Sequence, residues 1–564
     1  MKKMKKIISV LLALLLLFSL ASCGSTKGVD ARLIFPIDND PLFLDPQIIS
    51  DTGARNIILN CFEGLVTLGE NGEILPGMAE KWDVSSDGKT YVFYLRQNSR
   101  WRVTSAAKRV LGGDEIQLYP TYNEKGKLNP IEEGKEVFNI TVTAHDFVFG
   151  LRRAVRSETK CPTAYKLYSI TNARYIHEGR LPETDLGITA LDDHTLKIKL
   201  TNNDPDFLYT LLDPACMPCN EAFFESTGGR YGLATRYLIY NGPFYINNWA
   251  DNASVSIRKN SDYYYDAKNV MPYSVYFSIN DEQDTRLRKL KNETYDISPF
   301  NESQAQAVSG SKNYCVDSFK SAVYSLIFNC NDQYLKNIDV RRAVASAFNF
   351  NLVSVELGKE RANHIFPGAM TIGSAPYSQN AEKFSSYTSK DAKALLRKGL
   401  DAIDENNATV TVLCKTDDEL FARKLIQAWQ AGLGVVFNVS VETTDEYTLK
   451  KRIRSGDYQL ALSEIPYSGN SVQDSALMFT SDSRNNIFGY SSEGYDSVVK
   501  AIAQADSEAE KAKAASKAES YLSGAAVVLP LYEVKSYVAY DKGISGIIYN
   551  RTGDVLYFKN VLEE

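Results

Sequence analysis

The sequence predicts an α/β fold with discontinuous domains. Strand-like and helix-like patterns are mixed along the whole chain, and no internal repeat is present. Since 564 residues exceed what one hydrophobic core supports, two or three domains are expected. The composition, 44% hydrophobic and 23% charged, is that of an ordinary globular protein.

Four segments alternate apolar and polar side chains, which is the pattern of a half-buried strand. These segments are 90–96, 194–200, 254–259 and 408–414. Residues 103–139 are polar, contain glycine and lack a clear period. This region is predicted to be an inserted loop or a small hairpin.

Three segments are predicted to be helices. Segment 337–349 has an apolar face, and Asp339 is expected to cap its start. That face consists of Val340, Val344, Ala347 and Phe348. Segment 417–434 has an apolar stripe and is expected to end at Gly432 or Gly434. The stripe consists of Leu420, Leu425 and Trp429. Segment 507–522 has high helix propensity.

The N-terminus carries the pattern of a secretory leader. Residues 1–6 contain four lysines and no acid, and the apolar run 7–20 is too short to span a membrane comfortably. The run ends in Leu-Ala-Ser-Cys at 20–23, which resembles the bacterial lipoprotein signal. This resemblance implies cleavage after residue 22 and a lipid on Cys23, with 24–28 as a flexible tether. The alternative is an ordinary signal peptide with a chance cysteine.

Charge and cysteine content exclude some classes of protein. Loss of the four leader lysines moves the formal net charge from −6 to −10, and an acidic surface argues against a nucleic-acid partner. No second apolar run reaches the ~20 residues of a membrane-spanning helix.

The cysteines other than Cys23 are odd in number and irregularly spaced, so no disulfide framework is implied. The 34 tyrosines fit either half-buried strands or a wet cavity lined by rings.

Motifs that would indicate catalysis are weak. The sequence CMPC at 216–219 has the spacing of a thioredoxin-like redox pair, but a lone CxxC is weak evidence. Ser105 and Ser157 each begin a Ser-x-x-Lys motif, yet neither Ser-Asp-Asn nor Lys-Thr-Gly follows. The four histidines are scattered, and no G-x-S-x-G, G-x-G-x-x-G or Walker loop is present. The sequence therefore predicts a protein that is not an enzyme and uses no cofactor or metal.

Several blocks of sequence follow one another in an order that is typical of one protein family. They include DPLFLDPQ at 40–47, TVTAHDFVFGLRRAV at 141–155, NGPFYINNWADNASVSIRKNSDYY at 241–264 and IFNCNDQYLKNIDVRRAVASAFN at 327–349. The series runs from about residue 40 to about residue 540. It resembles the extracytoplasmic peptide-binding proteins of ABC importers, closest to the oligopeptide-binding type.

The resemblance implies a two-lobed receptor, like a periplasmic binding protein, with an extra domain in its N-terminal lobe. Lobe I would comprise 24–62, 210–322 and 527–564, the extra domain 63–209 with an insertion at about 103–139, and lobe II 323–526. The chain would cross between the lobes near Ser321 and near Val527, so that two strands form a hinge.

Family members close over an extended peptide and deliver it to a permease. The resemblance therefore implies a lipid-anchored, monomeric substrate-binding protein on the outer face of the cell membrane, or on its periplasmic side where an outer membrane exists. Its partners would be a peptide or peptide-like ligand and ABC permease subunits. Each lobe makes part of the contacts, so the ligand favours the closed state. Tethering raises the receptor's effective concentration near the permease.

The resemblance also places individual residues at the ligand. Tyr165 or Tyr168 matches a cleft-facing tyrosine, and Asn486 matches a position that faces the ligand. Asn241 and Gly242 open a block at the cleft floor. The alternatives are packing of the tyrosines inside the extra domain and a turn before a strand at Asn241.

The match fails where relatives hold the amino group of the ligand. The candidate ligand-binding segment consists of Glu464, Ile465, Pro466, Tyr467 and Ser468. Relatives carry a tryptophan and then an aspartate where an ungapped comparison places Ile465 and Ser468. Pro466 also removes a backbone donor from the strand expected to pair with peptide. Glu464 and Asp474 are the nearest acids, and one of them is expected to receive the ammonium; a ligand with a blocked or absent amino end is the alternative.

Two other functions remain compatible with the sequence. One is a sensory or adhesive lipoprotein on the same scaffold, which a neighbouring permease and ATPase gene would separate from a transport receptor. The other is an exported Ser-x-x-Lys serine hydrolase. Related receptors also bind nickel chelates, haem or sugars, but the few histidines and the lack of a positive cluster in the matched cleft favour a peptide.

Overall fold

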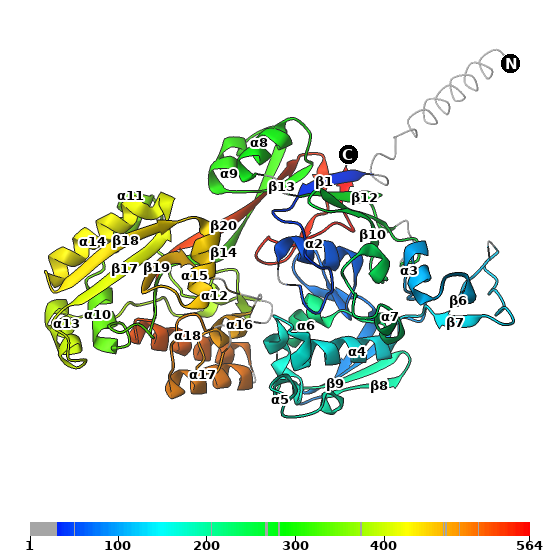
Figure 1. Ribbon diagram of the computed structural model, residues 1–564, viewed down its shortest axis with the longest axis horizontal. Coiled ribbons are helices and arrows are strands. Elements are labelled where there is room, and N and C mark those ends of the chain that lie inside the picture. The colour runs from blue at the N-terminus through cyan, green and yellow to red at the C-terminus, as the bar shows by residue number, and fades with distance from the viewer. Residues whose placement is uncertain are drawn as a thin grey trace, which may run out of the picture.

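The chain forms two lobes that two long strands connect (Figure 1). The computed structural model describes residues 31–563 apart from 50, 124, 205, 265–268, 280–281, 373–374, 466, 468–470, 484–485 and 506. Cys23, Pro466 and Ser468 thus lie outside the described residues. Below, the first lobe denotes residues 31–313 and 542–563, and the second lobe denotes 329–527. Among the described helices, none is both long enough and apolar enough to cross a membrane.

The first lobe contains a four-stranded sheet with the order β1-β12-β11-β10. Its strands are β1 (Arg32–Pro36), β10 (Phe244–Ala250), β11 (Ser254–Lys259) and β12 (Ser274–Ser278). Strand β1 is parallel to β12, whereas β11 is antiparallel to both of its neighbours. The strand predicted at 254–259 is therefore confirmed.

A second sheet of the first lobe is antiparallel throughout and has the order β4-β5-β9-β8. Its strands are β4 (Ala79–Val84), β5 (Thr90–Leu95), β8 (Ile188–Asp192) and β9 (Thr195–Lys199). Helix α4 (Ala144–Val155) begins after a capping box, in which the Thr143 N–H donates to the Asp146 carboxylate over 2.7 Å. The strands predicted at 90–96 and 194–200 are confirmed to within one residue at each end.

The N-terminal and C-terminal parts of the chain are held together by two asparagines of helix α2 (Thr52–Cys61). The Asn56 side chain donates to Asp554 O and accepts from Leu556 N, and the Asn60 side chain donates to Leu556 O and accepts from Phe558 N, each over 2.8 Å. These asparagines lie one helical turn apart, so each pairs with a separate step of the C-terminal tail. The first lobe is thereby built from distant segments.

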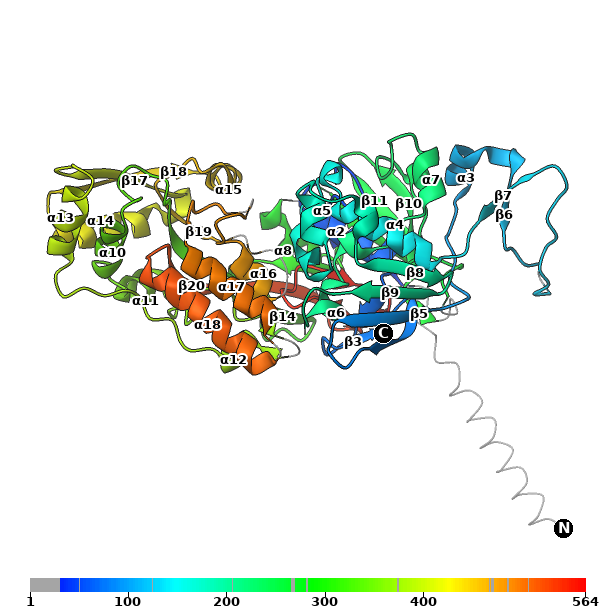
Figure 2. The same ribbon diagram turned by 90° about the horizontal axis from the view of Figure 1, so that it is seen from below.

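Residues 103–139, the predicted insertion, project from the end of the first lobe that lies away from the second lobe (Figures 1 and 2). It contains α3 (Ser105–Leu111), β6 (Ile116–Tyr119) and β7 (Glu136–Asn139). The two strands are parallel, so the predicted small hairpin is wrong. The 16 residues that connect them are long enough to return the chain to the starting end of the first strand.

Short elements complete the first lobe. They are β2 (Val66–Leu68), β3 (Ile74–Pro76), α5 (Ala173–His177), α6 (Phe207–Thr210), α7 (Glu221–Ser226), α8 (Gln283–Lys291), α9 (Glu302–Val308), β21 (Ile544–Ser545), β22 (Ile548–Tyr549), β23 (Leu556–Tyr557) and β24 (Leu562–Glu563). Strands β2 and β3 form a hairpin.

A six-stranded sheet with the order β13-β20-β14-β19-β17-β18 joins the two lobes. Its strands are β13 (Ile297–Phe300), β14 (Tyr314–Phe328), β17 (Ala408–Lys415), β18 (Phe437–Thr444), β19 (Leu460–Glu464) and β20 (Val528–Asp541). The antiparallel strands β14 and β20 run from one lobe to the other (Figure 1). Their register shifts at Lys320/Ala322 and again at Tyr324/Ser325. The strand predicted at 408–414 is confirmed.

Helices cover both faces of this sheet in the second lobe. Leu460 and Leu462 of β19 pack into one core, whereas Ala461 between them packs into another. The first core includes side chains of α10 (Ile338–Ser346), α11 (Asn351–Leu357), α13 (Ala392–Asp401) and α14 (Glu419–Leu433). The second includes side chains of α15 (Glu446–Ser455), α16 (Val472–Leu477), α17 (Glu493–Gln504) and α18 (Glu508–Gly524). The second lobe also contains three short elements, namely α12 (Tyr377–Asn380), β15 (Thr371–Ile372) and β16 (Ala375–Pro376).

All three predicted helices exist, with two corrections of detail. Asn337, not Asp339, caps α10, because its side chain accepts from the N–H groups of Asp339 and Val340. Leu425 and Trp429 of α14 are buried, but Leu420 is 65% exposed. Five residues separate Leu420 from Leu425, so the two side chains lie on different faces of the helix. Gly434 ends this helix.

Candidate functional site

Residues of both lobes line three cavities, which we call the interlobe cavities. They measure about 290, 210 and 40 Å³. The second lobe contributes residues of α16, of α17 and of the adjoining segments. The first lobe contributes residues between 160 and 213 and, in the smallest cavity, residues of α2, β2 and the C-terminal tail. Because neither lobe alone encloses these cavities, a molecule inside them would contact both.

Tyr165 and Tyr168 both line the two larger interlobe cavities. They come from a 3₁₀ helix, Ala164–Ser169, which exposes one side to the second lobe. The Tyr168 hydroxyl lies 2.7 Å from Nδ1 of His177 in the same lobe. The structure therefore brings both predicted tyrosines to the interlobe surface, with the Tyr168 ring fixed by its own lobe.

Lys166 lies between these tyrosines and carries a positive charge into the same surface. Its ammonium donates to Asp213 Oδ2 over 2.7 Å, and Arg55 approaches the same oxygen at 3.7 Å. Burial alone would raise the pKa of Asp213, but the charges of Lys166 and Arg55 hold it at about 2. The Lys166–Asp213 pair is thus ionised and almost completely buried in this closed arrangement of the lobes.

Asp474 carries a negative charge to the same place from the second lobe. It lies in the first turn of α16 and lines two of the interlobe cavities, as Lys166 does. Burial raises the pKa of Asp474 to about 7, against the opposing effects of Lys166 and the Ser471 side chain. Beside it, the buried Oε1 of Gln473 accepts no hydrogen bond from any residue that the structure describes. The second lobe thus presents acceptors to the cavity.

The structure places Asn241 and Gly242 inside the first lobe. Asn241 is 1% exposed, and its side-chain amide both donates to Glu63 O and accepts from Glu63 N. Gly242 packs against the backbone of Cys61, where an added Cβ would come within 2.6 Å of the carbonyl carbon. Both residues therefore join neighbouring segments of the lobe.

Asn486 is also occupied within its own lobe. Its amide donates to Thr480 O over 3.1 Å and to Tyr490 O over 2.6 Å, while its oxygen accepts from Phe488 N. These three bonds hold the loop before α17. No bond of this side chain among those described points to the first lobe.

The candidate segment of the second lobe is described in part. Ile465 is buried in the second-lobe core, and the Tyr467 hydroxyl donates to Ile365 O over 2.6 Å. Glu464 ends β19 opposite Tyr324, and burial raises the pKa of its carboxyl. Of the two predicted acids, Asp474 lines interlobe cavities and Glu464 does not.

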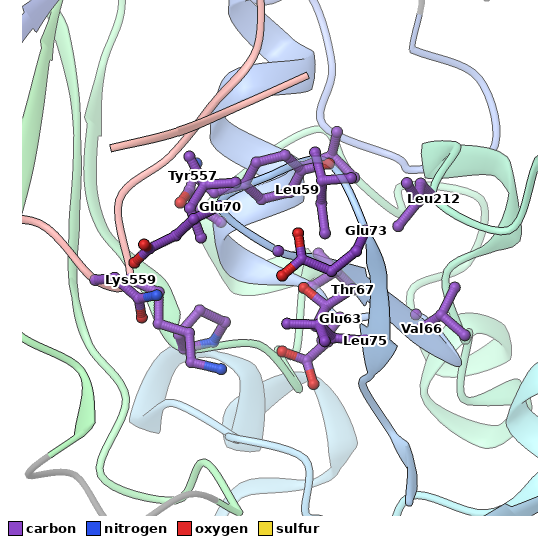
Figure 3. A pocket seen from close by; sticks show the side chains of 18 of the residues that line it. Leu59, Glu63, Val66, Thr67, Glu70, Glu73, Leu75, Leu212, Tyr557 and Lys559 are labelled. Carbon is purple, nitrogen blue, oxygen red and sulfur yellow. The ribbon is translucent and has the colours of Figure 1, made fainter. Parts of the chain in front are cut away.

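A further cavity of about 280 Å³ lies within the first lobe. Figure 3 shows it between the end of α2, the β2–β3 hairpin and the C-terminal tail, with the side chains of Glu70, Glu73 and Lys559 around it. Glu63 at its edge accepts hydrogen bonds from the hydroxyls of Tyr263 and Tyr264. All its lining residues belong to the first lobe, so closure of the lobes does not enclose it.

The thiols of the CMPC segment are buried. Cys216 is 2% exposed and Cys219 is 0% exposed, and both are free in the structure. Burial raises the pKa of Cys219 to about 12, although the nearby Arg153 opposes the shift. Burial likewise raises the pKa of Cys216. A redox or nucleophilic cysteine needs an accessible thiolate, which this environment disfavours.

Lys166, Asp213, Gln473 and Arg174 line the interlobe cavities, but the sequence did not identify them. Lys166 lies between the two predicted tyrosines in the sequence. Its position beside them is the signal that could have identified it as a cavity residue. Asp213 and Gln473 have no motif around them that marks a site. Their meeting depends on how the two lobes close, which local sequence does not encode.

Comparison with known proteins identifies the family. Residues 73–487 match the model of the bacterial extracellular solute-binding proteins, family 5. The chain is 25% identical to the probable deoxycholate-binding periplasmic protein YgiS of Escherichia coli K12, over 97% of this chain and 98% of that protein. It is also 25% identical to the oligopeptide-binding protein OppA of Bacillus subtilis 168, over 99% of each.

A solved structure shares the two-lobed fold. Haemophilus influenzae OppA in complex with the peptide RPPGFSPFR superposes with a TM-score of 0.74, at 20% sequence identity, over 95% of this chain and 99% of that one. This confirms the predicted α/β receptor fold. Because the family model covers most of the sequence and the fold agrees over nearly its whole length, the chain belongs to the bacterial extracellular solute-binding proteins of family 5.

Proposed function

We propose that this chain captures peptides or peptide-like solutes between its two lobes and delivers them to the permease of an ABC importer. The observation that supports this proposal is the composition of the interlobe cavities. Each lobe presents charged and aromatic side chains to one shared space, among them Tyr165, Lys166 and Asp474. Such a space suits a zwitterionic ligand whose backbone and side chains offer both charges, donors and acceptors.

The names of the relatives indicate more than one class of solute. YgiS is described as a probable deoxycholate-binding protein, and OppA as oligopeptide-binding. The residues of the interlobe cavities are the basis for a choice between these two classes. A bile acid is a large apolar anion, for which an ionised carboxylate would be an unfavourable neighbour. The cavities here contain Asp204, Asp474 and Asp482 as well as lysine and arginine. This mixture favours a peptide over an anionic steroid.

Asp474 is the residue that we propose receives the amino group of the ligand. The alternative acid, Glu464, lies at the end of β19 and does not line the described cavities. The Gln473 Oε1 atom has no hydrogen-bond partner among the described residues, so an ammonium beside it and Asp474 would satisfy both acceptors with one donor group. Charge-assisted bonds of this kind are worth roughly 1.5–3 kcal/mol, which corresponds to about ten- to a hundredfold in affinity.

The cellular setting belongs to the same proposal. The leader sequence supports a lipid on Cys23 that would hold a monomeric receptor at the outer face of the membrane, close to the permease subunits. The crossing strands β14 and β20 support a hinge between lobe I with its extra domain and lobe II, at boundaries near 323 and 527. Register shifts within these strands at 320–325 mark where bending would occur.

The test is to identify the ligand that the protein retains. Protein purified without added peptide is denatured, and the released small molecules are identified by mass spectrometry. The proposal predicts a heterogeneous set of short peptides, and titration calorimetry then shows saturable binding of an unblocked tetra-alanine. Recovery of bile acids or other non-peptide solutes, together with no heat from any peptide, would contradict the proposal.

A further inference from the structure

A lysine of the second lobe is buried between two aspartates of the first lobe. Lys511 lies in the first turn of α18, and its ammonium donates to Asp206 Oδ2 over 2.7 Å and to Asp204 Oδ1 over 3.2 Å. The side chain of Lys511 is 1% exposed, and those of Asp204 and Asp206 are 7% and 5% exposed. The contact therefore excludes water almost completely.

This burial exists only while the lobes are together. The two aspartates precede α6 in the first lobe, and Lys511 reaches them from a different lobe, more than 300 residues later in the chain. Separation of the lobes would return all three charges to water. The backbone N–H of Asp206 donates to Asp204 Oδ1 over 3.1 Å, which keeps the two carboxylates side by side whether or not Lys511 is present.

Removal of one of the three charged side chains destabilises the closed state more than the open state. In the closed state, removal of one partner leaves an uncompensated buried charge, which is strongly unfavourable. In the open state the same removal costs little, because the remaining charge is hydrated. Two carboxylates held side by side also repel each other until a cation reaches them. The closed state is therefore the one that a change at Lys511 affects.

The other ion pairs between the lobes, in the part of the chain that the structure describes, are exposed. Arg174 pairs with Asp482, with side chains 41% and 57% exposed, and Lys359 pairs with Glu302, at 31% and 45%. Exposed pairs of this kind contribute little to stability. The Lys511 contact thus differs from them in its burial and in having two acceptors.

We propose that Lys511, Asp204 and Asp206 form a latch that sets the free energy of lobe closure. These three residues position the lobes, while the other residues of the interlobe cavities hold the solute. Asp204 and Asp206 each line one of these cavities, so the latch closes the space beside the ligand. Its effect on affinity rests on the proposed capture function, whereas its effect on closure does not.

The experiment measures closure and affinity separately. Small-angle X-ray scattering gives the radius of gyration of ligand-free full-length protein, and calorimetry gives the Kd for tetra-alanine. Lys511→Met is expected to increase the radius of gyration and to weaken binding at least about tenfold. The triple variant Lys511→Met, Asp204→Asn, Asp206→Asn has no unpaired charge, so it is expected to recover most of the closure and affinity.

The control is Arg452→Met, because Arg452 pairs with Glu442 and Asp457 inside the second lobe. It should leave the radius of gyration and the Kd unchanged. Circular dichroism and the Tm of each variant separate a shifted lobe equilibrium from unfolding. Equal radii for wild type and a folded Lys511→Met, or a folded triple variant as open as Lys511→Met, would overturn the latch. If the wild type binds no peptide but its radius of gyration still differs from that of Lys511→Met, only the proposed capture function is overturned.

Discussion

Lys166 of the first lobe and Asp474 of the second lobe line the same two interlobe cavities. Lys166 is already paired with Asp213, whereas the side chain of Asp474 has the Ser471 hydroxyl as its neighbour and remains the acid with the raised pKa. Asp482 of the second lobe lines a cavity too, but it is paired with Arg174, so Asp474 is the better placed of the two to take a new positive partner. This difference has consequences for pH, for ligand choice and for the design of control variants.

The first prediction concerns pH. Burial raises the pKa of Asp474 from an ordinary 3.8 to about 7, so the closed state holds a proton that the open state releases between those values. The groups that face it are Lys166, Asp204, Asp206 and Ser471. Closure of the ligand-free protein is therefore favoured below pH 4, and this contribution is lost as the pH rises through 7. The radius of gyration should be smaller at pH 5.5 than at pH 8.

The matched control for pH is Asp146. Its pKa is also raised to about 7 by burial, but it bonds to Trp101, Thr143 and Asn220 within the first lobe. Asp474→Asn should remove the pH dependence of the radius of gyration, and Asp146→Asn should keep it. The opposite pattern would show that lobe closure does not bury Asp474.

The second prediction concerns stability of the first lobe. Asp45 forms a fully buried pair with Arg153 at 2.7 Å, and Gln47 accepts from the same guanidinium at 2.6 Å. Asp45→Asn leaves that charge without its partner, so the free energy of unfolding in urea should fall by about 3 kcal/mol. Glu442→Gln, which removes an exposed partner of Arg452, should change it by less than ~1 kcal/mol. Similar effects of the two variants would contradict the assignment.

The third prediction separates packing from binding at Gly242. An added Cβ would clash with the backbone of Cys61, which side-chain movement cannot relieve. Gly242→Ala should lower the Tm by several degrees, through a cost of about 1–3 kcal/mol, while the folded protein binds tetra-alanine within twofold of wild type. Gly524→Ala is the control, since no atom lies within 4 Å of its added Cβ. A large loss of affinity at an unchanged Tm would instead return Gly242 to the ligand site.

The fourth prediction concerns the buried thiols. Cys216 and Cys219 should not react with Ellman's reagent in the native protein, whereas the partly exposed Cys315 and Cys330 should react faster. The double variant Cys216→Ser, Cys219→Ser should bind tetra-alanine within a few fold of wild type. Reduction of insulin by the wild type and not by the double variant would mean that the CMPC segment has a redox activity.

The fifth prediction concerns the anchor. Cys23→Ala removes the site of lipid attachment, so the protein should be released from the membrane fraction or remain unprocessed. Because a single acyl chain binds a membrane only marginally, the diacylated cysteine should be needed for retention. Membrane fractionation and intact-mass measurement check both points. Full retention of the variant would contradict the anchor.

Much of the fold could be predicted because its signals are local. The alternation at 254–259 and the propensity of 507–522 depend only on neighbouring residues, and both elements formed as predicted. Asn337 caps the helix in place of Asp339 because either residue type suits that role and the helix begins two residues earlier than predicted. The pairing of β6 with β7 was missed because the direction of a strand depends on the path of the connecting segment.

The candidate site was harder to predict. Tyr165 and Tyr168 were predicted from the family resemblance, and the structure places both at interlobe cavities. Lys511 lies in a helix rich in lysine and alanine, where nothing distinguishes it from its exposed neighbours until the lobes meet. Asn486 was expected at the ligand, but its side-chain amide donates to the backbone of its own loop. The sequence could not separate these two roles, because an asparagine amide suits both. Contacts between the lobes therefore cannot be predicted from local sequence patterns.

Calorimetry with tetra-alanine and N-acetyl tetra-alanine tests directly whether the protein recognises the amino end of its ligand. Wild type should bind the acetylated peptide at least about tenfold more weakly, because acetylation removes the ammonium proposed to meet Asp474. Asp474→Asn should lose that preference, and Glu464→Gln should keep it. Equal affinity of the wild type for both peptides would contradict the account, since the amino end of the ligand would then not be recognised.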